Sequence, residues 1–167
     1  MDLQKRSEVY DLLILGSGAG SKLLAWTFAG QGQRVAVVEL KYVGGSCPNI
    51  ACLPSKNIIH TAQIAHDVRR SEEFGISIDS FRTNMPTVRD RKRRMVQELV
   101  DAHLALYKQS GTELIMASGR FVGPKIIEAT LQNGMKRLLS SKNIVIGTGT
   151  HAVIENISGL ASASDPY

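Results

Sequence analysis

The sequence predicts an α/β fold in which a largely parallel sheet packs against helices. Two short apolar runs typical of buried strands, Val9–Leu15 and Arg34–Leu40, enclose a glycine-rich turn and a helical pattern. A long amphipathic helix pattern extends from about Thr87 to Gln109. Short extended runs follow it, where a regular strand–helix alternation would place another helix. The 167 residues suffice for one domain with a sizeable core.

The first strands and helix form a βαβ unit. The helix Lys22–Ala29 carries Leu24 and Phe28 four residues apart, and Gly30 and Gly32 end it. Parallel strands with a right-handed crossover are the default for a unit of this kind, about 30 residues long.

The turn of this unit has the features of a dinucleotide-binding, Rossmann-like site. Gly16 and Gly18 allow a tight turn and close approach to a pyrophosphate, which the helix N-terminus attracts. Glu39, at the end of the second strand, is placed to accept hydrogen bonds from a ribose. The third glycine position holds Ser21, for which we expect a slight shift in packing. The alternative is a tight strand–helix turn without a ligand.

Both cysteines lie in one short segment. A regular helix would separate Cys47 and Cys52 by at least about 7.5 Å, whereas a disulfide needs Cα atoms within about 7 Å. Pro48 therefore predicts an irregular start, followed by a helix from Ser55 to about Arg70. The helix start and Lys56 favour the thiolate form.

The cysteine pair has three interpretations. A redox-active pair is the first, and two inert core thiols are the second. Half of a zinc site is the third, but His60, His66 and His103 show no matching ligand spacing.

The net charge of +5 raises the question of nucleic acid. Much of the excess lies in the run 89–94 on the long helix, which we interpret as a solvated helix face. No membrane span or signal peptide is predicted, so we expect a soluble, cytoplasmic protein.

The rest of the chain predicts more strands after Gly111, which ends the long helix. Residues 74–82 are expected to be loop with a short extended piece. An Asn133-Gly134 hairpin signal indicates that three of the runs form an antiparallel meander. The predicted strands are Glu113–Met116, Arg120–Val122, Ile126–Ala129, Lys136–Leu139 and Asn143–Ile146.

The segment 44–56, GGSCPNIACLPSK, resembles the active-site motif of the class I pyridine nucleotide–disulfide oxidoreductases. That family includes dihydrolipoamide dehydrogenase, glutathione reductase and mercuric reductase. The resemblance covers essentially this whole chain but only the N-terminal part of the family's chain. It implies an FAD-binding domain over residues 1–155 and the start of a linker over 156–167, without the NAD(P) and dimerisation domains. The absent later strand implies an exposed sheet edge.

The resemblance also implies residue roles. Cys47 would attack the substrate, Cys52 would face the flavin, and Lys56 would stabilise the reduced flavin. His151 and Ala152 stand where the family commonly has Arg and Pro. The residues implied to bind FAD are Gly16, Gly18, Ser21, Glu39, Gly45, Ser46, Lys56, Gly119, Thr148, Gly149 and Thr150.

The implied function is FAD-dependent, NAD(P)H-linked reduction of a small disulfide or a metal ion, by a homodimer in the full-length family. We expect this chain alone to turn over little. One alternative is a stand-alone FAD- or nucleotide-binding module with a redox dithiol, completed by a partner chain. Another is a basic nucleotide- or nucleic-acid-binding protein with incidental cysteines.

Overall fold

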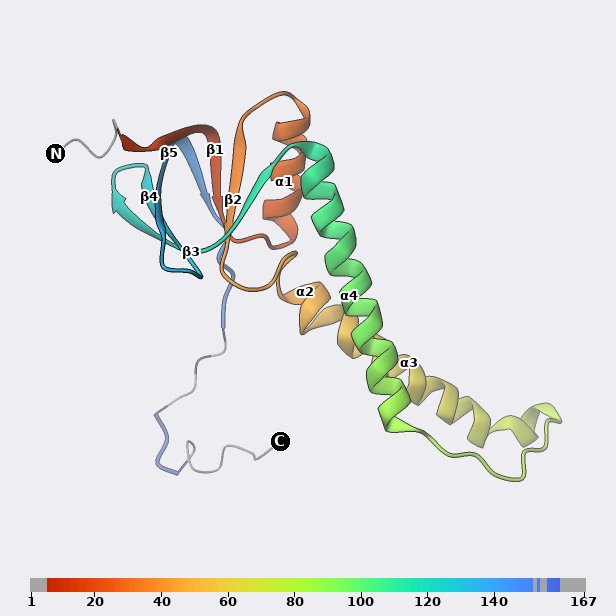
Figure 1. Cartoon of the computed structure of the whole chain (residues 1–167). Helices are drawn as coiled ribbons and strands as arrows, with labels where there is room; N and C mark the ends of the chain where they lie inside the picture. Colours follow the sequence, from red (N-terminus) through yellow and green to blue (C-terminus); the bar gives the residue numbers. More distant parts are fainter. Residues whose placement is uncertain (1–5, 152, 154–155, 160–167) are drawn as a thin grey trace.

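The structure, a computed structural model, describes residues 6–151, 153 and 156–159 and confirms the α/β fold. Figure 1 shows the sheet at one end of the molecule, with α1 and the last part of α4 beside it. The first part of α4 and α3 extend away from the sheet. The elements in chain order are β1 (Glu8–Leu15), α1 (Ala19–Gly30), β2 (Val35–Glu39), α2 (Ser46–Asn49), α3 (Cys52–Arg69), the 3-10 helix η2 (Ser71–Phe74), α4 (Met85–Ser110), β3 (Glu113–Gly123), β4 (Ile126–Leu131) and β5 (Lys136–Ile146).

The five strands form a closed ring in the order β1-β2-β3-β4-β5. β1 pairs in parallel with both β2 and β5, and β2 pairs in parallel with β3. β4 pairs antiparallel with β3 and β5, which is the predicted meander. The tight turn before β5 is the predicted hairpin, with Gly134 at φ 83°.

The structure has fewer and longer strands than predicted. Four of the predicted strands are halves of two long strands, β3 and β5. β3 runs without a break from Glu113 to Gly123, and β5 from Lys136 to Ile146. The small residues between the halves look like breaks in the sequence, but they let each strand pass from the parallel sheet into the meander. At Gly119, a Cβ would lie 2.6 Å from Leu15 Cδ2, so a larger residue would require the buried Leu15 side chain to move.

The ring is closed over only part of the length of β5. The first half of β5, Lys136–Ser140, pairs with β4, whereas Asn143–Ile146 pair with β1 and with no second strand among the described residues. The described chain therefore leaves a sheet edge at the second half of β5.

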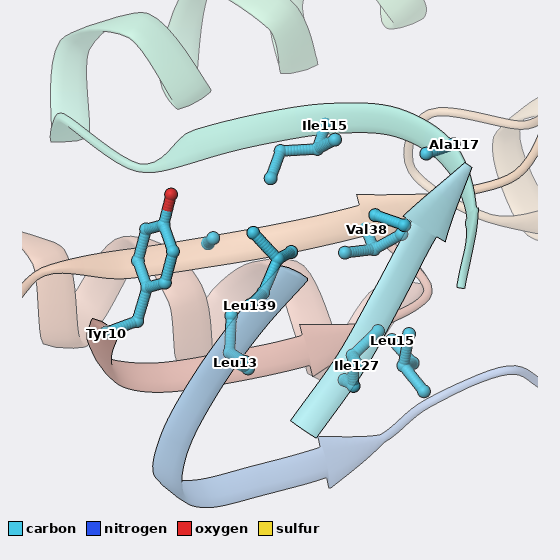
Figure 2. Close-up of a cluster of buried hydrophobic side chains, with 10 residues drawn as sticks. Tyr10, Leu13, Leu15, Val38, Ile115, Ala117, Ile127 and Leu139 are labelled. Atoms are coloured by element: carbon cyan, nitrogen blue, oxygen red, sulfur yellow. The ribbon is translucent and has the colours of Figure 1, made fainter. Parts of the chain in front are cut away.

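Alternate residues of β1 serve two hydrophobic cores. Leu13 and Leu15 point into the ring toward the meander, where they meet Ile127 and Leu139 (Figure 2). Leu12 belongs to the other core, which packs against α1 and α4. Burial on both faces explains why β1 and β2 are almost continuously apolar.

The helical hairpin of α3 and α4 is closed by side-chain contacts. Asn84 caps α4 by accepting a hydrogen bond from the Thr87 amide, at 3.1 Å. Arg91 belongs to the basic run predicted to be a solvated face, but it is half-buried and donates to the Thr61 hydroxyl on α3, at 2.7 Å.

In the loop before α4, residues 75–84 form no strand, so the extended piece expected there is absent. Across the described ranges, no helix combines the length and apolar character that a bilayer crossing requires.

An ion-pair network ties β1, β3 and β5 together at the end of the sheet where β1 begins. Arg137 Nη2 lies 2.6 Å from Glu8 Oε2 and 2.8 Å from Glu113 Oε1. Tyr10 donates its hydroxyl hydrogen bond to Glu113. The hydrogen bond from Arg137 holds the pKa of Glu8 below its ordinary value, and burial with Glu113 raises the pKa of Tyr10 to about 12.

We predict that Arg137→Gln lowers the free energy of unfolding at pH 7 by about 1 kcal/mol, because two carboxylates lose their shared cation. Glu8 has a depressed pKa in the folded state, so the stability that it contributes is present above pH 4.5 and is lost as the pH falls. Urea unfolding should therefore show the gap between Arg137→Gln and wild type shrinking from pH 7 to pH 3. Arg94→Gln, on the exposed face of α4, is the control. The same pH-dependent gap in both variants would contradict this assignment.

Candidate functional site

A cavity of about 500 Å³ opens at the carboxyl ends of β1 and β2. This is the edge at which open α/β sheets bind their ligands. Of the residues expected to bind FAD, the cavity brings together Gly16, Gly18, Glu39, Gly45, Ser46, Gly119, Thr148, Gly149 and Thr150. Ser21 and Lys56 do not line it.

Glycines shape the cavity because the backbone comes close to itself there. Gly16 has φ 90°, and a Cβ on it would collide with the Gly147 carbonyl. Gly45 has φ 82°, and a Cβ on it would lie 2.7 Å from Gly18 Cα. Three separate segments of the chain therefore meet without side chains between them.

Gly18 leaves the N-terminus of α1 open to the cavity. It is the N-cap residue, with φ −60° and no side-chain hydrogen bond to the first turn. A Cβ at Gly18 would meet nothing within 4 Å. The first amides of α1 are thus free for an anion, and no acidic side chain lies in the first turn to oppose it.

Ser21 has a packing role in this structure. It is buried on α1, and a Cβ at Gly147 would collide with its hydroxyl. The serine at the third glycine position therefore packs α1 against the end of β5, and it lies outside the cavity.

Glu39 is buried with four hydrogen bonds to its carboxylate. Oε2 accepts from the amide and the hydroxyl of Ser17, at 2.8 and 2.7 Å. Oε1 accepts from the amides of Lys41 and Tyr42, at 2.8 and 2.9 Å. Burial raises the pKa of Glu39, but these bonds outweigh it and hold the pKa below its ordinary value. Because a carboxylate has about four acceptor positions, a ribose hydroxyl would have to share one of them.

Ser17 connects Glu39 to the segment that carries the cysteines. Its side chain is fully buried and accepts from the Gly44 amide at 2.9 Å. Its single hydroxyl proton points to Glu39 at 2.7 Å, with the Tyr42 carbonyl as a second acceptor at 3.1 Å. We did not identify Ser17 from the sequence, because the variable position between two glycines gives no signal. Its partners become visible only when the loop after β2 is placed.

The cysteine segment is irregular, as predicted. α2 ends at Asn49 and α3 begins at Cys52, three residues before the predicted start. The Asn49 side chain holds this turn by donating to the carbonyls of Val43 and Gly45, at 3.0 and 2.8 Å. Proline in the first turn of a helix is tolerated, and Pro54 occupies that position in α3.

Cys47 and Cys52 lie near each other and are not joined by a disulfide in this structure. Cys47 is half-buried and Cys52 is exposed. Hydrogen bonding with Cys52, then burial, raises the pKa of Cys47, while the charges of Lys22 and Lys56 act in the opposite direction. Lys56 is exposed on α3. Over the described ranges, no three or more His, Cys, Asp or Glu side chains are grouped to hold a metal ion.

We predict that Ser17→Ala lowers the free energy of unfolding by about 1–3 kcal/mol, because the Gly44 amide loses its acceptor and Glu39 loses one of its four hydrogen bonds. Urea denaturation measures the change. Ser80→Ala, in the exposed loop before α4, is the matched control. Equal stability of the two variants would show that Ser17 does not hold this loop.

Comparisons with known proteins point in one direction. A profile of the pyridine nucleotide-disulphide oxidoreductases matches residues 10–165. The chain is 31% identical to the dihydrolipoyl dehydrogenase of Acholeplasma laidlawii over 94% of its own length and 46% of that protein's. It is 32% identical to the mercuric reductase of Lysinibacillus sphaericus, over 90% of its own length and 27% of the relative's.

A solved structure agrees with these relatives. The flavoprotein disulfide reductase RclA from Escherichia coli, solved as a Cu(II) complex, superposes with a TM-score of 0.72 and 25% identity. The match covers 90% of this chain and 31% of RclA. The chain thus spans less than half the length of these relatives. The profile match covers nearly all of the chain, which therefore belongs to the pyridine nucleotide-disulphide oxidoreductase family.

Proposed function

We propose that this chain forms the flavin- and dithiol-bearing part of an FAD-dependent, NAD(P)H-linked reductase of disulfides or metal ions. One observation carries the proposal: the glycine-lined cavity and the Cys47–Cys52 segment are joined by the close approach of Gly45 to Gly18. The family is FAD-dependent, and the cavity's volume lies within the usual range for cofactor sites, about 300–1,000 Å³.

The residues present fit the ADP half of FAD. The open N-terminus of α1 at Gly18 suits the pyrophosphate, and ionised Glu39 suits a ribose. Gly119 and the turn 147–150 line the rest of the cavity. Lys56 and Cys52 belong to the flavin-ring side in this proposal. When bound, FAD would supply electron transfer from a reduced nicotinamide to the disulfide.

The dithiol does the exchange chemistry with the substrate. The Cys47 thiolate attacks one sulfur of a substrate disulfide, whose S–S bond breaks to give a mixed disulfide and a leaving thiolate. Cys52, as its thiolate, then attacks Cys47 Sγ and releases the second substrate thiolate. Two electrons pass to the substrate, the cysteines end as a disulfide, and the thiol protons pass to solvent or to the products.

The substrate class is proposed from the relatives. Because the relatives include a dihydrolipoyl dehydrogenase and a mercuric reductase, we propose a small disulfide or a soft metal ion as the substrate. The nicotinamide substrate and a homodimer are proposed on the same ground. Completion of the site by a partner chain is the second candidate, and the cavity's exposure beside the open edge of β5 favours it.

We predict that Gly18→Ala weakens FAD binding at least about tenfold, because its methyl group would project toward the pyrophosphate position. The fold has room for it, since φ −60° suits alanine and no atom lies within 4 Å of the added Cβ. Gly20→Ala is the control: it is also unobstructed, but it does not line the cavity. Fluorescence titration with FAD measures both. If neither variant changes the affinity, or the wild-type chain binds no FAD, this proposal for the cavity is wrong.

We predict that mild oxidation joins Cys47 and Cys52 within one chain, because Cys52 is near enough to raise the pKa of Cys47. Thiol titration should count two groups before oxidation and none after it. Intact mass should show the loss of two hydrogens without a dimer. Cys47→Ser should keep one thiol throughout. Disulfide-linked dimers of the wild-type chain would contradict an internal redox pair.

A further inference from the structure

A lysine–histidine pair joins α1 to α4 beside the cysteine segment. Lys22 Nζ lies 2.6 Å from His103 Nε2, and both side chains are half-buried. The His103 ring stacks on Trp26, with ring centroids 5.9 Å apart and 23° between the planes. Tyr107 meets the other side of this cluster, its ring 5.4 Å from that of Trp26 in an edge-on arrangement.

The same histidine lies against the turn that leads to Cys47. A Cβ on Gly44 would lie 2.8 Å from His103 Nδ1, so only glycine allows this approach. The next residue, Gly45, rests on Gly18 at the start of α1. The Gly44–Cys47 turn is thus held between the first turn of α1 and the His103 ring.

The lowered pKa of His103 favours a neutral ring, which can accept a hydrogen bond from the Lys22 ammonium group at Nε2. Burial, then the charge of Lys22, lowers the pKa of His103, while the Leu99 carbonyl opposes this shift. A neutral ring that accepts at Nε2 carries its proton on Nδ1, which is buried and has no hydrogen-bond partner among the described residues. Lys22 is then the cation of the pair, and His103 orients its ammonium group.

The contacts of His103 with Lys22 and with Gly44, and of Gly45 with Gly18, bring the ammonium group near the turn that carries Cys47. Burial lowers the pKa of Lys22, and the charge of Cys47 raises it. In return, Lys22 is the first of the two cations that lower the pKa of Cys47, before Lys56. The other titratable group beside Cys47 is the Cys52 thiol.

We propose that Lys22 and His103 are a positioning pair that holds an ammonium group beside Cys47 and thereby promotes thiol–disulfide exchange by this cysteine. The inference rests on the proposed role of the dithiol and assigns its charge partner. Lys22 acts in its protonated form and exchanges no proton with the substrate. It stabilises the negative charge on Cys47 Sγ before attack, and again when Cys52 displaces this sulfur from the mixed disulfide. His103 acts through Lys22 and does not touch the substrate.

The test measures Cys47 alone, in the reduced chain with Cys52→Ser as background and without FAD or nicotinamide. The rate of alkylation by iodoacetamide is followed from pH 6 to pH 10, because only the thiolate reacts. We expect Lys22→Met to slow the reaction at pH 7 about tenfold and to shift the midpoint of the profile upward. Lys22→Arg should restore most of the rate. His103→Leu, which removes the acceptor, should give a smaller loss in the same direction.

Two controls separate charge from structure. Lys108→Met removes a lysine from the exposed last turn of α4 and should leave the profile unchanged. Lys22→Gln keeps a polar side chain without the charge and should behave like Lys22→Met if the charge matters. An unchanged profile in Lys22→Met and Lys22→Gln overturns the inference, as does an equal shift in Lys108→Met.

The two proposals fail separately in this design. A chain that shows the Lys22 effect but binds no FAD supports the pair and contradicts the flavin site. A chain that binds FAD but whose Cys47 alkylation rate is unchanged by Lys22→Met supports the flavin site and contradicts the pair. If Lys22→Met unfolds, near-ultraviolet circular dichroism shows it, and Lys22→Arg against Lys22→Gln then decides the question.

Discussion

The buried hydrogen bonds between Ser17 and Glu39 hold the site together. Glu39 ends β2, Ser17 follows β1, and the same carboxylate binds the amides of Lys41 and Tyr42. A buried carboxylate is costly unless each oxygen has partners. Because the Glu39 carboxylate accepts four hydrogen bonds, it fixes the position of the loop after β2. The cysteine segment follows this loop directly, so its position depends on these hydrogen bonds.

Close backbone contact supplies what hydrogen bonds do not. Gly16 passes over Gly147, and Gly45 rests on Gly18, so main chain forms part of the cavity wall. Main-chain walls leave amide groups facing the cavity, which suits a phosphate. They also explain why Ser21 is tolerated: it lies on the packed side of α1, against Gly147, where its hydroxyl does not enter the cavity.

The fold and most of the cavity residues could be predicted from local sequence patterns. The other features depend on contacts between segments that are far apart in the sequence, so they could not be predicted. The Gly16–Gly18 turn and the apolar strands were predictable because each signal lies within a few residues. The continuity of β3 and β5 could not be predicted, because small residues between the two halves of each strand resemble a break. In β5 these residues are Ser140 and Ser141. In the structure both serines are buried, and Ser141 donates to the Asp11 carbonyl at 2.9 Å. Lys22 and His103 are 81 residues apart, so no sequence spacing relates them.

α1 links the two halves of the site. Its N-terminus opens to the cavity at Gly18, and one turn further on Lys22 contacts His103, which lies against the turn before Cys47. The helix therefore presents positive potential twice, once from its dipole and once from a side chain. The two sources are separable, because Lys22 does not line the cavity and Gly18 carries no charge. A change at Lys22 should alter the thiol without altering the nucleotide site, provided that His103 and Trp26 keep α1 against α4.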